Sequence, residues 1–136
     1  MPFVRIDLRK GKSKDYRKTL GEIVYAAMRE LINVPQDDKF QVITEHDRED
    51  LNHAESYLGN RYSEDIVFIQ ITLNAGRSIE MKKAFYQRIV DEYQKQLDGR
   101  PDDIVINLVE TAKASITPKA IWATATARMS SSSRSR

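Results

Sequence analysis

The residue with the clearest chemical potential is the proline that follows the initiator methionine. Removal of Met1 is expected before a proline, and it would make Pro2 the true N-terminus. The secondary amine of a terminal proline is rigid, and once deprotonated it has a lone pair that can accept a proton from carbon. Proline is also tolerated as the first residue of a strand. The dipeptide alone leaves both interpretations open, a catalytic base or a plain strand start.

Metal chemistry has weaker support. His46 and His53 stand seven residues apart in a charged stretch with Asp47 and Asp50, a spacing that matches no recognised ligand pattern. The chain has no cysteine, which excludes thiolate ligands, thiolate nucleophiles and disulfides. We therefore expect solvated loop residues here and no metal site.

An internal duplication with an offset of 65 residues organises the chain. The matched pairs are Gly11 and Gly76, Lys12 and Arg77, Ser13 and Ser78, Lys18 and Lys83, Leu20 and Phe85, and Val24 and Ile89. One residue later in register, Pro35 matches Pro101 and Asp37 matches Asp103. Each unit reads strand, glycine turn, helix, Pro-Asp turn and strand, and such a repeat fixes the fold.

Alternation and turn residues predict four strands, at 3–8, 40–43, 65–73 and 102–109. Ser13 and Ser78 are suitable N-caps for two helices, and the polar stretch 45–65 is a long connection. The apolar stripes of the helices are Leu20, Val24, Ala27, Met28 and Leu31, then Met81, Phe85, Ile89, Tyr93 and Leu97. Right-handed crossovers put both helices on one face of a four-stranded sheet, an α+β fold of duplicated β-α-β units.

The third strand is apolar on both sides, with Ile66 and Phe68 on the side away from the helices. Two helices cover only one sheet face, so the other face needs a partner. A second copy of the chain is the simplest partner, and we expect no monomer.

Charge divides the chain into a body and a tail. The net charge is +2, but residues 112–136 carry five basic residues and no acid, which leaves 17 basic against 20 acidic residues elsewhere. We expect a folded unit at 1–111 and a basic, Ser/Arg-containing, partly disordered tail at 112–136. The acidic body argues against a nucleic-acid-binding face on the folded unit. No apolar run reaches a membrane span, and no signal-peptide core is visible, so a cytoplasmic protein is expected.

Taken together, these features resemble the tautomerase superfamily. The stretches "VPQDDKFQVITEHD" (34–47) and "NAGRSIEMKKAFYQRI" (74–89) are similar to its malonate semialdehyde decarboxylase-like branch, and the resemblance runs from residue 2 to about residue 110. It implies a homotrimer, a small carboxylate substrate, and no metal or organic cofactor.

The resemblance also implies roles for four residues. Pro2 would be the general acid/base, and Asp38 would orient a water or hold the protonated Pro2, although it could be structural. Arg77, just before a helix N-terminus, would bind the substrate carboxylate with a bidentate fork. Relatives often have a second arginine where this chain has Asn74, which would give a hydrogen bond without charge.

The function that follows is tautomerisation of a small keto/enol carboxylate or decarboxylation of a 3-oxo carboxylate such as malonate semialdehyde. The sequence leaves these two reactions open. The missing second arginine and the unusual tail also allow an inactive trimeric binding or scaffold protein on the same fold. A nucleic-acid-binding module is a third hypothesis, in which affinity resides in the tail alone and falls steeply with salt.

Overall fold

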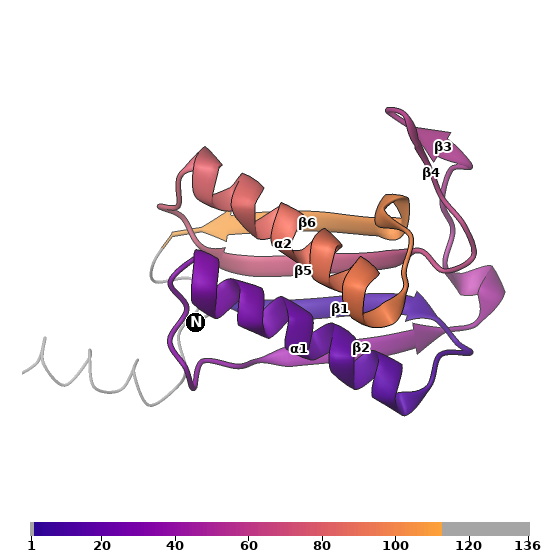
Figure 1. Ribbon diagram of the computed structural model, residues 1–136, viewed down its shortest axis with the longest axis horizontal. Helices are drawn as coiled ribbons and strands as arrows, with labels where there is room; N and C mark the ends of the chain where they lie inside the picture. The colour runs from indigo at the N-terminus through magenta and orange to yellow at the C-terminus, as the bar shows by residue number, and fades with distance from the viewer. Residues whose placement is uncertain (1, 113–136) are drawn as a thin grey trace, which may run out of the picture.

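The structure, a computed structural model, describes residues 2–112 (Figure 1). Two long helices and four long strands make up the body, and a two-stranded hairpin lies in the connection between the two units. Two short 3₁₀ turns are also present, at Arg48–Asp50 and Pro101–Asp103. The elements are β1 (Phe3–Arg9), α1 (Lys14–Leu31), β2 (Gln41–His46), β3 (Ser56–Tyr57), β4 (Asn60–Arg61), β5 (Val67–Asn74), α2 (Ile79–Leu97) and β6 (Ile104–Thr111).

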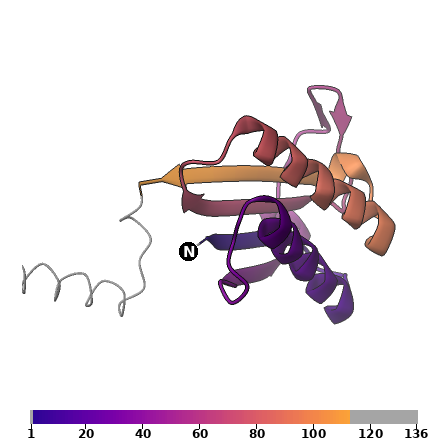
Figure 2. The ribbon, with the colours of Figure 1, turned by 60° about the vertical axis from the view of Figure 1, so that its left-hand side comes forward.

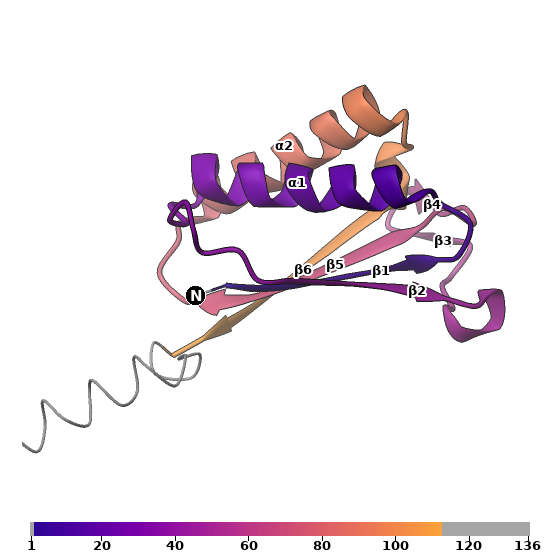
Figure 3. The same cartoon turned by 90° about the horizontal axis from the view of Figure 1, so that it is seen from below.

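The main sheet has the order β2-β1-β5-β6. β1 and β2 are parallel, β5 and β6 are parallel, and the central pair β1–β5 is antiparallel. Both helices lie on the same side of the sheet, and the other side is left open (Figure 3). The predicted α+β architecture is confirmed. The second strand is longer than predicted, because its pairing with β1 continues as far as Arg9 opposite His46.

The two units use the same turn chemistry before each helix. Gly11 and Gly76 have φ angles of 122° and 128°, a region that side chains with a Cβ rarely adopt. The Ser13 Oγ accepts a hydrogen bond from the Tyr16 N–H, and the Ser78 Oγ accepts one from the Met81 N–H. Both predicted N-caps are confirmed, and the duplication is a structural one.

The core lies between the helices and the inner face of the sheet. The predicted helical stripes are confirmed at their centres, while their outer members Leu31, Met81 and Leu97 are half-buried. The fully buried stripe residues are Leu20, Val24, Ala27, Met28, Phe85, Ile89 and Tyr93.

One residue predicted for the open face needs no partner chain to cover it. Ile66 is 1% exposed and immediately precedes β5, and its N–H donates to the carbonyl of Ser63. It is buried outside the core cluster that the helices form with the sheet. Phe68 does have the parity of the open face, since its neighbours Val67 and Ile69 are buried in the core.

A pair of tyrosines joins the two helices through the core. The hydroxyls of Tyr16 and Tyr93 are 2.7 Å apart, and their rings meet edge to face. Tyr93 is 1% exposed, in agreement with its place in the predicted apolar stripe. Burial, above all, raises the pKa of both phenols above the ordinary value of 10.0.

This pair predicts a loss of stability in alkali. Below about pH 10 the phenols are neutral in both states, but above it only the unfolded chain ionises them readily, which favours unfolding. The free energy of unfolding from urea titrations should therefore be unaffected by these phenols up to about pH 9 and fall as the pH rises through and above about 10. Tyr93→Phe should make the fall smaller. An equal fall in wild type and variant would assign the alkaline sensitivity to other groups.

The sheet is complete at Thr111, and residues 113–136 lie outside the described part of the chain. The predicted boundary between a folded unit and a basic tail therefore stays a prediction. Neither of the long helices described in residues 2–112 is apolar enough to cross a membrane.

Candidate active site

The four residues predicted for the site come from segments that meet at one end of the sheet. β1 begins at this end, β5 and β6 finish there, α1 ends there, and α2 starts there (Figure 1). Pro2 precedes β1, Asp38 precedes β2, Asn74 is the last residue of β5, and Arg77 lies in the turn before α2. The fold thus brings together residues that are up to 75 positions apart in the sequence.

Pro2 is buried at the start of the central strand. The next N–H that points to the same side, that of Val4, donates to the carbonyl of Phe40 at 3.0 Å. Because N–H directions alternate along a strand, the Pro2 nitrogen faces the segment that leads into β2. Asp38 lies in that segment, two residues before Phe40, and its Oδ1 atom is buried. The turn that positions Asp38 is closed by a hydrogen bond from its N–H to the Pro35 carbonyl at 3.2 Å.

Arg77 is held by two backbone carbonyls. Its Nε donates to Ile32 at 3.0 Å and its Nη1 donates to Asn74 at 2.9 Å. Of the five N–H donors of a guanidinium, three remain without a partner in the described chain. No carboxylate of residues 2–112 forms an ion pair with it, so its positive charge is uncompensated there. This arrangement suits an anion.

Sequence reasoning missed the part played by Ile32. Its carbonyl lies at the C-terminal end of α1, where helical carbonyls lack intrahelical partners. Arg77 supplies one such partner and is fixed in return. A contact across 45 residues between a side chain and a backbone carbonyl has no local signal in the sequence.

Asn74 contributes to the site in a way that the sequence did not predict. Its backbone carbonyl accepts the hydrogen bond from Arg77. Its side-chain Oδ1 is buried and has no hydrogen-bond partner among the described residues. A buried amide oxygen in this state favours a donor brought from outside the described chain, because leaving it unpaired is costly.

With this geometry known, comparison with other proteins becomes informative. Residues 38–115 match one tautomerase enzyme family and residues 2–61 match another. The chain is 36% identical over 108 residues to the probable tautomerase YusQ of Bacillus subtilis (strain 168), covering 79% of this chain and 85% of that protein. The chain belongs to the tautomerase family. A second relative, the probable tautomerase YrdN of the same organism, is 25% identical over 84% of this chain and 88% of its own.

Solved structures agree with this family assignment. A malonate semialdehyde decarboxylase superposes with a TM-score of 0.81 at 24% identity, covering 91% of this chain and 98% of its own. The FG41 malonate semialdehyde decarboxylase inhibited by 3-bromopropiolate gives 0.78 at 28% identity over 91% and 96% of the two chains. The fold is also shared by a fused 4-OT protein that forms a symmetric trimer, with a TM-score of 0.71 at 18% identity over 87% and 94% of the two chains. The predicted resemblance to the malonate semialdehyde decarboxylase-like branch is confirmed.

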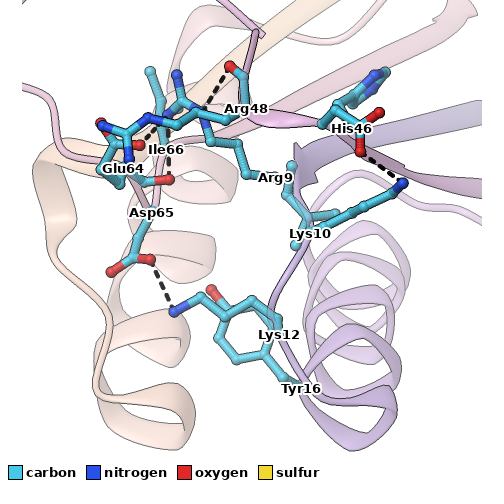
Figure 4. Close-up of a pocket in the computed structure, with 11 residues that line it drawn as sticks. Arg9, Lys10, Lys12, Tyr16, His46, Arg48, Glu64, Asp65 and Ile66 are labelled. Atoms are coloured by element: carbon cyan, nitrogen blue, oxygen red, sulfur yellow. Dashed lines mark hydrogen bonds and ion pairs between the residues drawn. The ribbon is translucent and has the colours of Figure 1, made fainter. Parts of the chain in front are cut away.

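Because the fold of this tautomerase is duplicated, the opposite end of the sheet corresponds to the candidate site. The charged side chains at that end are arranged differently. A cavity of about 360 Å³ opens there, lined by Lys12 among other charged residues (Figure 4). Lys12, the repeat partner of Arg77, forms an ion pair with Asp65 at 2.9 Å, and its ammonium group lies over the ring of Tyr16. The other cations are also engaged: Lys10 with Asp47 at 2.7 Å, Arg48 with Glu64 at 3.1 Å, and Arg9 with the Leu51 carbonyl at 2.6 Å. The positive charges at this end of the sheet are therefore compensated by groups of the same chain, whereas the charge of Arg77 is not compensated within residues 2–112.

The counterpart of Asp38 has likewise become structural in this tautomerase. The strand register pairs Val4 with Gln41 and Val67 with Ile104, so the paired strands of both units are separated by the same number of residues. The offset of 65 residues between the units therefore also holds here, and it aligns Asp103 with Asp38 rather than with Asp37. Asp103 is completely buried, and it accepts hydrogen bonds from the N–H and Oγ of Ser63 at 2.8 and 2.6 Å. The same carboxylate position thus holds a loop at one end of the sheet, and at the other end it lies in the segment that the Pro2 nitrogen faces.

The two histidines differ from expectation in part. His46 lies at the end of β2 rather than in a loop, with its Nε2 atom 2.7 Å from Asp7 Oδ1. His53 does lie in the connection, where its Nδ1 atom is 2.7 Å from the carbonyl oxygen of Ala54. Within residues 2–112, no three His, Asp or Glu side chains gather in a way that could hold a metal ion.

Proposed function

We propose that this tautomerase acts on a small carboxylate with a keto, enol or 3-oxo group, with the amine of Pro2 as general acid/base. Arg77 binds the carboxylate and orients the reacting carbon. Asp38 holds the protonated amine or orients a water. Asn74 accepts a hydrogen bond from a substrate hydroxyl through its buried Oδ1 atom. The positive charges of Arg77 and the protonated amine supply the electrophilic stabilisation that a metal would otherwise give.

The observation that carries the proposal is the state of Arg77. Its guanidinium is fixed by two uncharged carbonyls, keeps three N–H donors available, and lies at the same end of the sheet as Pro2. A cation that is positioned but not neutralised favours a monoanion. With Asn74 in place of a second arginine, the site offers no second fixed cation for a dianion.

In the tautomerase reaction, the Pro2 nitrogen removes a proton from the carbon next to the carbonyl, and the electron pair of that C–H bond forms the enolate. Return of the proton to the oxygen or to another carbon completes the isomerisation. In the decarboxylase reaction, the bond between C2 and the carboxylate breaks and carbon dioxide leaves. The electron pair of the broken C–C bond is accepted by the 3-oxo group, which the protonated Pro2 polarises. Arg77 has the same role in both reactions.

We further propose a homotrimer, as in the fused 4-OT proteins of the same fold. Support from this chain comes from the open sheet face, where Phe40 and Val42 are 44% and 42% exposed. The alternative function, an inactive trimeric binding or scaffold protein, is favoured by one observation, the absence of the second arginine at Asn74.

Two measurements test the enzymatic proposal. The mass of the intact purified chain should be that of the protein without Met1. The proposed mechanism requires this removal, because a Pro2 nitrogen acylated by Met1 has no basic lone pair. The protein without Met1 should then turn over phenylenolpyruvate or malonate semialdehyde. A rise of activity with pH would identify the free amine as a base, and a fall would identify the protonated amine as the acid. Inactivity of the processed protein on both substrate types would favour the scaffold alternative.

A further inference from the structure

The connection between the two units carries a small hairpin that extends away from the body of the molecule. β3 and β4 pair only with each other, and they project beyond the sheet and helices in two different views (Figures 1 and 2). We call residues 55–62 the hairpin arm. Its tip is apolar and open to solvent, with Tyr57 64% exposed and Leu58 84% exposed. Such a tip contributes little to the core of its own chain.

The backbone at the tip makes the leucine harder to explain. Leu58 has a φ of 50° and Gly59 a φ of 87°, the pattern of a type I′ turn with both central residues at positive φ. Asn-Gly is the preferred sequence for this turn, since asparagine tolerates the left-handed region better than other residues with a Cβ. Leu58 therefore adopts an unfavourable conformation and buries almost nothing in the isolated chain. Its side chain would be useful if another surface covered it.

The hairpin arm is anchored at its base. The N–H of Arg61 donates to Asp102 Oδ2 at 3.0 Å, and Arg100 donates to the carbonyl of Arg61 at 3.0 Å. A further backbone bond joins Tyr62 to Glu55 across the base of the arm. The tip is thus held in a fixed direction, which reduces the conformational entropy lost on docking.

A receiving surface exists on the open face of the sheet in the same chain. A groove of about 430 Å³ lies there. Its apolar lining residues include Leu51, Phe68 and Val105, and its polar ones include Asp7, His46, Asp50, Gln70 and Asn107. The chain therefore carries both an apolar projection and a recess of mixed polarity with apolar side chains that could cover it. A contact between two different surfaces of identical chains closes into a ring when the rotation between copies allows it.

We propose that the hairpin arm of each copy docks its Tyr57–Leu58 tip in the open-face groove of the next copy. This assignment rests on the trimer given under the proposed function, and it adds the element that joins neighbouring copies. A second copy is the favoured occupant because the arm and the groove belong to one chain whose fold neighbours include trimers.

The decisive variant is Leu58→Asn, because the fold and the interface predict opposite results. Asparagine suits the turn better than leucine, so the hairpin should keep or improve its stability. Loss of the buried leucine at an interface should nevertheless weaken self-association by about 10- to 100-fold. Sedimentation velocity over a concentration series, with urea unfolding of the dissociated chain, measures both effects. Leu58→Met, which keeps an apolar side chain, is the matched control and should assemble within a few-fold of wild type.

A double-mutant cycle locates the contact. Val105→Thr alters the groove at nearly constant volume, and if Leu58 contacts the groove, its effect should be smaller in the Leu58→Asn background. Additive effects would overturn docking in this groove, and unchanged assembly of Leu58→Asn would overturn the role of the arm. A wild-type protein that sediments as a folded monomer at micromolar concentration would contradict the trimer itself, whatever its activity. These outcomes are independent of the catalytic measurements on Pro2.

Discussion

Replacing Pro2 with alanine is expected to lower kcat by about 10²-fold, with a much smaller change in KM. Alanine also presents an amine after methionine removal, but a primary amine has a different basicity and lacks the ring that fixes its direction. The nitrogen faces the segment containing Asp38, so even a small rotation changes the path of the proton. Substrate binding depends on Arg77, which this substitution does not touch.

Steady-state kinetics on whichever carboxylate the wild type turns over provide the measurement. Pro101→Ala is the control for the loss of a proline far from the site, because Pro101 begins the 3₁₀ turn before β6 at the other end of the sheet. It should leave kcat unchanged. An unaltered kcat in the Pro2 variant would remove the amine from the mechanism and leave the fold assignment intact.

Replacing Arg77 with alanine is expected to lower kcat/KM by about 10²- to 10³-fold, since it removes charge-assisted hydrogen bonds to the substrate carboxylate. KM should rise, and kcat should fall as well if the same contact positions the reacting carbon. Lys12→Ala is the matched control, because Lys12 is the counterpart of Arg77 in the first unit and pairs with Asp65. Its activity should match that of wild type.

Arg77 also binds the carbonyls of Ile32 and Asn74, so the variant could lose activity by loosening the end of α1. Two further measurements separate these effects. Arg77→Lys keeps the charge but cannot form the same fork, and it should be intermediate in KM. Urea unfolding of both variants should show a stability close to wild type. A large loss of stability with an unchanged KM would make Arg77 a structural residue.

Much of this architecture was readable from the sequence because local signals repeat in it. Gly11 and Gly76 are required by their backbone angles, and Ser13 and Ser78 by the N–H groups that they cap. A motif that occurs twice at a constant offset predicts the repeated β-α-β unit and the side on which the helices pack, whereas the order β2-β1-β5-β6 is seen only in the structure. Family resemblance then pointed to Pro2, and the topology explains why it lies near the other predicted residues.

Other features depend on contacts that no local pattern encodes. Alternation predicted Ile66 as part of an apolar face that needs a partner, but it precedes β5 and is already buried within the single chain. The hairpin arm was missed because its turn uses Leu58 in place of the asparagine that would have signalled it. The carbonyl of Ile32 was missed because backbone groups carry no sequence identity at all.

The duplicated fold allows at most one N-terminal proline amine in each chain. A polypeptide has one amino terminus, so of two equivalent sheet ends only one can begin with a free proline amine. The corresponding position of the second unit is Val67, an internal peptide nitrogen with no basic lone pair. However many copies assemble, the number of proline amines equals the number of chains. A reagent that alkylates this amine should therefore abolish turnover after one equivalent per chain, and any peptide fused ahead of Pro2 should silence every site without disturbing the fold.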